Sequence, residues 1–160
     1  MTLSTLGAAH FAAALAALAL GLAVILEQKG SMTHRMIGGG YAVAMILLNV
    51  TALGIYRLTG HITPFHLLAL ISLAILARGL AAVWRRRAGW LVTHYYSMAW
   101  SYVGLLAAAS AEVAARVPLG LVHSRRDGMI VGLVCVAAFL VIGFITVPRL
   151  KARALAYQRD

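Results

Sequence analysis

The sequence predicts an all-α integral membrane protein, a single domain over residues 1–160 that folds as a compact bundle of about five transmembrane helices. Hydrophobic residues make up 62% of the 160 residues and charged residues only 11%, whereas an ordinary soluble domain is roughly 45 to 50% apolar. The apolar residues form runs close to the roughly 20 residues that a helix needs to cross a bilayer. The expected spans are Leu6–Leu26, Met36–Leu58, Phe65–Trp84, Leu91–Val117 and Met129–Leu150.

Short connections separate these runs, so successive helices are expected to pack as antiparallel neighbours. The first span is dominated by alanine, glycine and leucine. Small residues let helices approach closely where lipid supplies no hydrophobic drive. We therefore interpret the first span as a packing helix.

Basic residues indicate how the chain is oriented in the membrane. The chain has 14 Lys and Arg residues against 4 Asp and Glu residues, and most of the basic residues lie between or after apolar runs, as topology signals do. We therefore expect the lipid bilayer as partner and no nucleic acid. Lys29, Arg35, the arginines at 85–87 and the basic tail share one side if all five runs span. This bias predicts an N-terminus outside and a C-terminus in the cytoplasm.

The second span carries polar residues on one helical face. Steps of three and four from His34 reach Gly38, Tyr41, Met45 and Asn49. Polar groups are expensive in a membrane and usually face the bundle interior. Gly38 and the two glycines after it lie one turn above His34, where missing side chains leave room for a flat cofactor or for a neighbouring helix. The histidine beside this gap favours a cofactor.

The fourth span repeats this arrangement. His94 lies at its start, and Glu112 lies five turns further along the same face, in the other leaflet. His34 and His94 both open helices that enter from the cytoplasmic side. We therefore expect them to lie at the same depth and to form an inner pair.

A second group of polar residues is expected at the outer side of the membrane. His66 opens the third span, and His123 lies just before the fifth. His10, His61 and Glu112 fall at a similar level. His66 and His123 form the expected outer pair, with His10 and Glu112 as further candidate ligands.

Two histidines on neighbouring helices suit the two axial positions of haem iron. Catalytic zinc usually takes three protein ligands, but a carboxylate such as Glu112 could complete a histidine–carboxylate site for Cu, Zn or Fe. Glu112 and Arg116 are also spaced to form a helical salt bridge. Arg78 lies inside the third span, where it could reach the interface by snorkelling or pair with a haem propionate.

Three motifs follow one another in this part of the chain: NVTALGIYR at 49–57, a histidine-led helix FHLLALISLAILARGLAAV, and a helix that opens with THYYSMAW. They resemble the cytochrome b561 family, two-haem transmembrane electron carriers in which ligand pairs join alternate helices of a four-helix core. The resemblance implies haem b, a core of spans two to five, and the pairs His34 with His94 and His66 with His123. That family has six spans where this chain has five.

The stretch KGSMTHRMIGGGY at 29–41 resembles an uncharacterised bacterial family, domain of unknown function 2306. This second resemblance implies a bacterial inner membrane and gives no activity.

Three function classes remain open. The first is a membrane-bound b-type cytochrome that transfers electrons through bis-histidine haem, with one or two haem b groups and an unidentified donor and acceptor. The second is a non-haem protein that binds or reduces Cu, Zn or Fe with the same histidines. The third is a structural protein whose histidines only form hydrogen bonds. No hydrolase motif is present, so any enzyme activity is expected to be oxidoreductase activity. A homodimer is compatible with all three.

Overall fold

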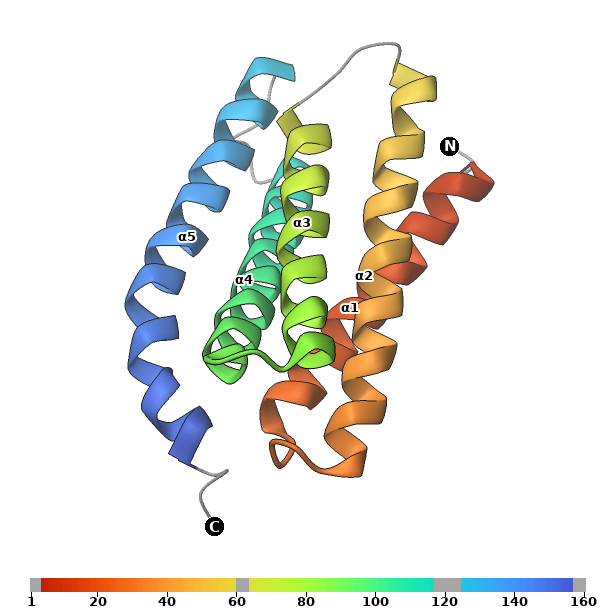
Figure 1. The fold of residues 1–160 in the computed structure, drawn as a ribbon. Helices are drawn as coiled ribbons and strands as arrows, with labels where there is room; N and C mark the ends of the chain where they lie inside the picture. Colours follow the sequence, from red (N-terminus) through yellow and green to blue (C-terminus); the bar gives the residue numbers. More distant parts are fainter. Residues whose placement is uncertain (1–3, 60–63, 117–124, 157–160) are drawn as a thin grey trace.

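The computed structural model describes residues 4–59, 64–116 and 125–156, and the regular structure in these ranges is entirely helical. The five helices are α1 (Thr5–Leu26), α2 (Met32–Thr59), α3 (Pro64–Arg85), α4 (Trp90–Arg116) and α5 (Arg125–Ala156). Successive helices run in opposite directions, so α1 begins at the upper end of the bundle and α5 finishes at the lower end (Figure 1). The expected all-α fold class is thus confirmed.

Four of the described helices are long and apolar enough to cross a membrane. The qualifying segments are Thr5–Leu26, Met32–Gly54, His66–Arg85 and Ile130–Ala152, in α1, α2, α3 and α5. Helix α4 is not among them, although its 27 residues measure about 40 Å. Its His, Tyr, Ser and Glu side chains make it more polar, and α1, α3 and α5 all pack against it. Protein therefore takes the place of lipid around much of α4.

Three glycines bring neighbouring helices close to α4. A Cβ atom on Gly21 of α1 would overlap the ring of Tyr102. A Cβ atom on Gly79 of α3 would lie 2.9 Å from Met98 Sδ, and one on Gly143 of α5 would lie 2.8 Å from a valine side chain of α4. Close backbone approach is a main source of packing energy between helices in lipid. These glycines therefore fix how α1, α3 and α5 dock on α4.

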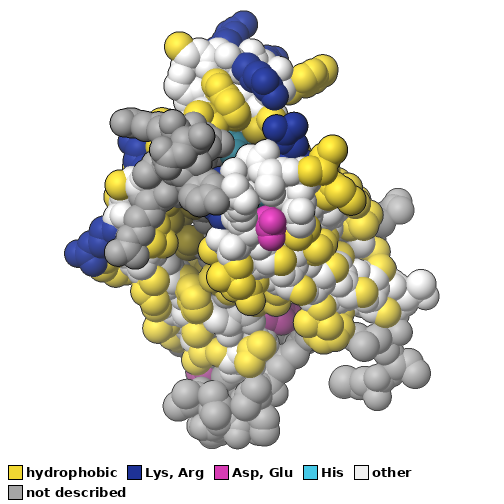
Figure 2. All heavy atoms as spheres, turned by 90° about the horizontal axis from the view of Figure 1, so that it is seen from below, with side chains coloured by type: hydrophobic (Ala, Val, Ile, Leu, Met, Phe, Trp, Pro, Cys, Tyr) yellow, Lys and Arg dark blue, Asp and Glu magenta, His cyan; other side chains and the backbone are white. Residues whose placement is uncertain are grey.

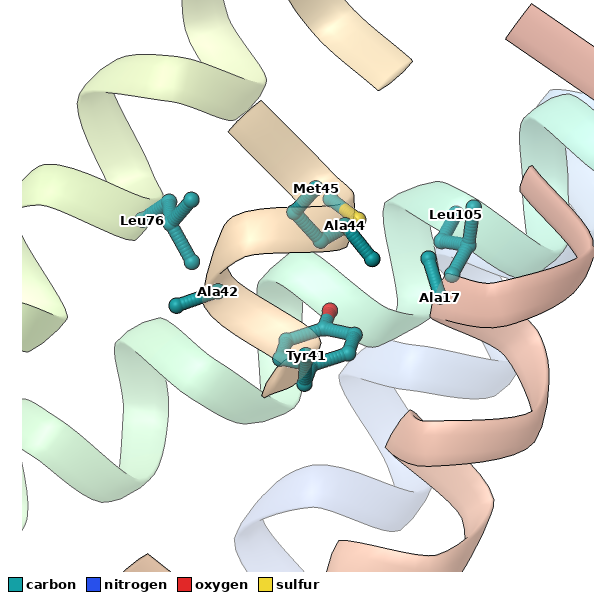
Figure 3. Close-up of a cluster of buried hydrophobic side chains, with 7 residues drawn as sticks. All are labelled: Ala17, Tyr41, Ala42, Ala44, Met45, Leu76 and Leu105. Carbon is teal, nitrogen blue, oxygen red and sulfur yellow. The ribbon is translucent and has the colours of Figure 1, made fainter. Parts of the chain in front are cut away.

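The buried core lies among α1, α2, α3 and α4. Figure 3 shows its cluster of side chains, which comprises Ala17, Tyr41, Ala42, Ala44, Met45, Leu76 and Leu105. Among the described helices, α5 packs against α4 alone. The four-helix core was expected from spans two to five, but it consists of α1, α2, α3 and α4. The small residues of α1 allow α2 and α4 to pack onto it, and α5 lies at the edge of the bundle.

The polar stripe predicted on α2 faces the bundle interior. Tyr41, Met45 and Asn49 are 2%, 1% and 5% exposed. The Tyr41 hydroxyl lies 2.8 Å from Ser101 Oγ on α4, and Asn49 Nδ2 donates to Ser72 Oγ on α3 at 3.2 Å. Hydrogen bonds between helices are favourable where no water competes. The stripe therefore joins α2 to two other helices.

Replacing Gly21 by alanine is expected to destabilise the bundle. The new Cβ would overlap the Tyr102 ring, whose hydroxyl is held on the Leu18 carbonyl at 3.2 Å. Overpacking typically costs about 1–3 kcal/mol, against a gain of at most about 1 kcal/mol from the better helix propensity of alanine. We expect Gly21→Ala to lower the thermal unfolding midpoint in detergent, measured by circular dichroism.

The matched control is Gly39→Ala on α2, because no atom lies within 4 Å of the Cβ position there. This variant gains the same propensity without a clash, and its midpoint should stay level or rise. Equal midpoints for both variants would contradict the packing role of Gly21.

Candidate functional site

Two histidines lie at the lower end of the bundle, where α2 and α4 begin. His34 is in the first turn of α2, and its backbone N–H donates to Ser31 Oγ at 3.0 Å. This cap starts the helix at Met32 instead of the expected Met36. His94 is in the second turn of α4. Both side chains are half-buried and close enough to interact electrostatically. The structure therefore brings the predicted inner pair to one end of the bundle.

A backbone carbonyl orients the His94 ring. His94 Nδ1 lies 3.0 Å from the Gly79 carbonyl oxygen. Since a carbonyl only accepts, Nδ1 carries the proton, and in the neutral ring the lone pair is on Nε2. This is the arrangement by which an outer partner prepares an imidazole to bind a metal. The sequence analysis missed this role of Gly79, because a single glycine in an apolar helix does not indicate which side chain its carbonyl will meet.

His34 carries a buried nitrogen that makes no hydrogen bond. Its Nδ1 is shielded from solvent and has no hydrogen-bond partner in the described part of the chain. The ring also interacts with the Val24 carbonyl at the end of α1. A buried polar atom without a partner is uncommon in native proteins and calls for an explanation. A ligand bound at Nδ1 is one such explanation.

Lys29 closes the end of α1 beside His34. Its Nζ donates to the carbonyls of Val24, Ile25 and Glu27 at 3.0, 2.7 and 2.8 Å, which satisfies acceptors that the helix leaves open. Partial burial lowers the pKa of Lys29, and the charge of Glu27 opposes this shift. The sequence analysis used Lys29 only as a topology signal and missed its contact with the same carbonyl that His34 meets.

Open space exists beside the glycines that follow His34. A Cβ on Gly38 would meet only Val24 Cγ2, at 4.0 Å, and a Cβ on Gly39 would meet nothing within 4 Å. Gly40 alone makes a close contact, with Leu20 Cδ1 at 3.4 Å. Close helix packing can therefore explain the need for glycine only at position 40. The open space predicted beside His34 is present at Gly38.

Tyr41, a predicted cofactor-binding residue, already has a structural role. Ser101 Oγ donates to the Met98 carbonyl at 2.9 Å, so in the 2.8 Å contact between Tyr41 and Ser101 the Tyr41 hydroxyl is the donor. Burial and this hydrogen bond place Tyr41 inside the core cluster. Whether Tyr41 also contacts a cofactor stays a prediction.

The predicted outer group lies at the opposite end of the bundle. His66 is in the first turn of α3, and its Nε2 is buried. His10 Nδ1 lies 3.1 Å from Thr51 Oγ1, and since that hydroxyl donates to the Leu47 carbonyl at 2.7 Å, His10 is the donor and joins α1 to α2.

The other predicted members of this group are Glu112, His123 and His61. Glu112 is exposed near the end of α4. His123 and His61 lie outside the described residues, so the outer pair stays a prediction. Within 4–59, 64–116 and 125–156, no group of three or more His, Cys, Asp or Glu residues could hold a metal ion.

Arg78, the remaining predicted cofactor-binding residue, lies on the face of α3 that is exposed at the surface of the bundle. Its side chain is exposed and lines a surface pocket of about 340 Å³ together with Arg85, Arg87 and the first residues of α4. Its neighbour in the chain, Gly79, faces α4 and His94. Arg78 and His94 therefore lie near the same end of the bundle but on different sides of the α3–α4 contact.

These features define a helical membrane protein with a histidine pair at one end of its bundle. The chain belongs to the family described as "Predicted membrane protein (DUF2306)", whose model matches residues 7–147. No curated protein and no solved structure matches the chain. The match confirms the predicted resemblance to this family, and nothing in these comparisons supports the resemblance to cytochrome b561.

Proposed function

We propose that the protein is a membrane-bound b-type cytochrome that transfers electrons through haem held by His34 and His94. The observation that carries the proposal is how the ring nitrogens of His34 and His94 are hydrogen-bonded. His94 presents an Nε2 lone pair because its Nδ1–H is held by the Gly79 carbonyl, and His34 has a buried Nδ1 without a hydrogen-bond partner in the described residues. His94 would therefore hold the group through Nε2, and His34 would hold it through a ring nitrogen.

The surroundings of the pair fit a large planar group. Helices α2 and α4 lie across the four-helix core from each other, with α1 and α3 as the neighbours that both share. The open space beside Gly38 adds room one turn above His34. The residues present therefore fit haem in ligand type, in the tautomer of His94 and in the space beside His34.

When bound, haem iron supplies one-electron transfer by changing between its ferric and ferrous states. The chain's own residues hold and orient the group. The Gly79 carbonyl fixes the His94 ring, and the Ser31 cap fixes the start of the helix that carries His34. Deeper in the bundle, Tyr41, Met45 and Leu76 are buried in the core cluster. This packed cluster would lie between the haem and the opposite end of the bundle.

The orientation and the setting belong to the same proposal. Basic residues gather at the end that carries His34 and His94, which supports a cytoplasmic location for this end, with the N-terminus outside. We extend the proposal to a bacterial inner membrane, to haem b, and to a donor and an acceptor that remain to be identified. A second haem on His66 and His123 stays a prediction.

Visible spectroscopy tests the proposal directly. The protein is expressed with ample haem, purified in mild detergent, and measured as oxidised and as dithionite-reduced protein. We expect a Soret band and sharp α and β bands on reduction, as bis-histidine haem gives. A folded but colourless preparation would refute the proposal, and elemental analysis for Cu, Zn and Fe would then test the non-haem alternative.

Ligand assignment rests on three substitutions. His34→Ala and His94→Ala should each abolish the same chromophore, because each removes one axial ligand of one iron. His10→Ala is the matched control, since it removes a histidine that bonds to Thr51 at the other end of the bundle, and it should keep the chromophore. Loss of different spectral components in the two ligand variants would show that the pairing is wrong.

Gly79 offers a test of the orienting carbonyl. A Cβ at this position would lie 2.9 Å from Met98 Sδ and 3.0 Å from Ser97 Cβ, so Gly79→Ala should push α3 away from α4 and weaken the bond to His94. We expect less haem per protein, measured by pyridine haemochrome. Gly104→Ala on α4, where nothing lies within 4 Å of the Cβ position, should bind haem as the unmodified chain does. Equal haem content in both variants would argue against a role for the Gly79 carbonyl.

A further inference from the structure

A basic pocket lies at the lower end of the bundle, outside the core. Its volume is about 340 Å³, and it is formed where α3 ends and α4 begins. Arg78 and Arg85 line it from α3, Arg87 from the connection, and Trp90 and Thr93 from α4. The remaining lining residues are three alanines. The pocket thus has a mostly apolar surface and is bordered by three arginines.

The charged residues that line this pocket are all basic. Its lining contains three arginines and no acidic residue. Arg86, between two of them, lies with its guanidinium 5.7 Å from the centre of the Trp90 ring, which is a cation–π contact. Figure 2 views the bundle from this end and shows Lys and Arg side chains at the top and at the left of the view. Guanidinium groups bind phosphate with paired hydrogen bonds, so a phosphate is the expected ligand.

The depth of Arg78 points to a ligand that comes from the bilayer. Arg78 lies two turns before Arg85, about 10 Å deeper along the helix axis. It is exposed at the surface of the bundle, and it lies within the segment His66–Arg85 that is apolar enough to span the membrane. A charged side chain at such a position is costly unless it reaches the interface or meets an opposite charge. An anion held between Arg78 and Arg85 would supply that charge.

The residues that line the pocket agree with a lipid headgroup. The alanines at 81 and 82 lie one turn beyond Arg78 on the same helix face and line the pocket between the two α3 arginines. Trp90 also lines the pocket, and tryptophan is typical of the membrane interface. Pockets of basic residues between transmembrane helices bind the headgroups of anionic lipids.

We propose that this pocket binds the phosphate of an anionic phospholipid from the surrounding leaflet, with Arg78, Arg85 and Arg87 as the recognising groups. The phosphate lies against the guanidinium groups, and the glycerol and upper acyl chains lie along the alanine surface and Trp90. The lipid then covers the outer side of the α3–α4 contact whose inner side carries the Gly79–His94 bond. This site is independent of the haem proposal, because it uses neither histidine.

Native mass spectrometry of the purified full chain tests the proposal. The protein in detergent is incubated with phosphatidylglycerol, with phosphatidylcholine, or with phosphatidylglycerol and excess inorganic phosphate. We expect one phosphatidylglycerol to be retained in preference to phosphatidylcholine, and inorganic phosphate not to displace it. Equal retention of the two lipids, or full displacement by inorganic phosphate, would overturn the proposal.

Two double variants locate the site. Arg85→Gln with Arg87→Gln removes two pocket arginines and should lower phosphatidylglycerol retention by on the order of tenfold. Arg35→Gln with Arg149→Gln is the control, because it removes two exposed arginines that do not line the pocket and lowers the net charge equally. An equal fall in both would overturn the proposal by showing that charge alone governs retention.

Arg78→Gln tests whether Arg78 binds the lipid or a haem propionate. If Arg78 binds the lipid, this variant loses phosphatidylglycerol and keeps the haem spectrum of the unmodified chain. If it loses the spectrum and keeps the lipid, Arg78 serves the cofactor and the lipid proposal is overturned. Circular dichroism confirms that each variant remains helical before retention is compared.

Discussion

The packing of α1, α3 and α5 around α4 is the constraint on which the rest of the structure depends. Helix α4 is not among the described helices that are apolar enough to cross a membrane, and its middle section receives a glycine from each of three neighbours, Gly21, Gly79 and Gly143. In lipid, helices gain little from hydrophobic burial against one another, so close contact and hydrogen bonding must hold them. The three glycines provide that close contact along the middle of α4.

The same packing builds both proposed sites at the lower end. Because Gly79 allows α3 to lie directly against α4, its carbonyl is within hydrogen-bond reach of His94 Nδ1. On the outer side of that contact, Arg78 and Arg85 of α3 meet Thr93 of α4 around a pocket. A change in the distance between these two helices would therefore alter the histidine and the arginines together.

Several polar side chains of the described helices join one helix to another. The Tyr102 hydroxyl donates to a carbonyl of α1, and the Tyr95 hydroxyl donates to the Val147 carbonyl of α5. His10 bonds to Thr51 across α1 and α2. His34 differs, because its buried Nδ1 has no hydrogen-bond partner in the described ranges. This contrast separates His34 from His10, whose Nδ1 is held by Thr51.

The sequence by itself determined the all-α membrane fold, the approximate helix ranges and the end of the bundle at which His34 and His94 lie. These follow from run length, apolar composition and strict alternation of helix direction, which are local properties. Only the tertiary structure decided that α1 belongs to the core and α5 to its edge, and that Gly79 orients His94. It also decided that Arg78 faces a pocket with Arg85 and Arg87. These depend on which helix faces meet, and apolar helices of similar composition carry little information about their neighbours until small residues such as Gly21 and Gly79 are placed against specific side chains.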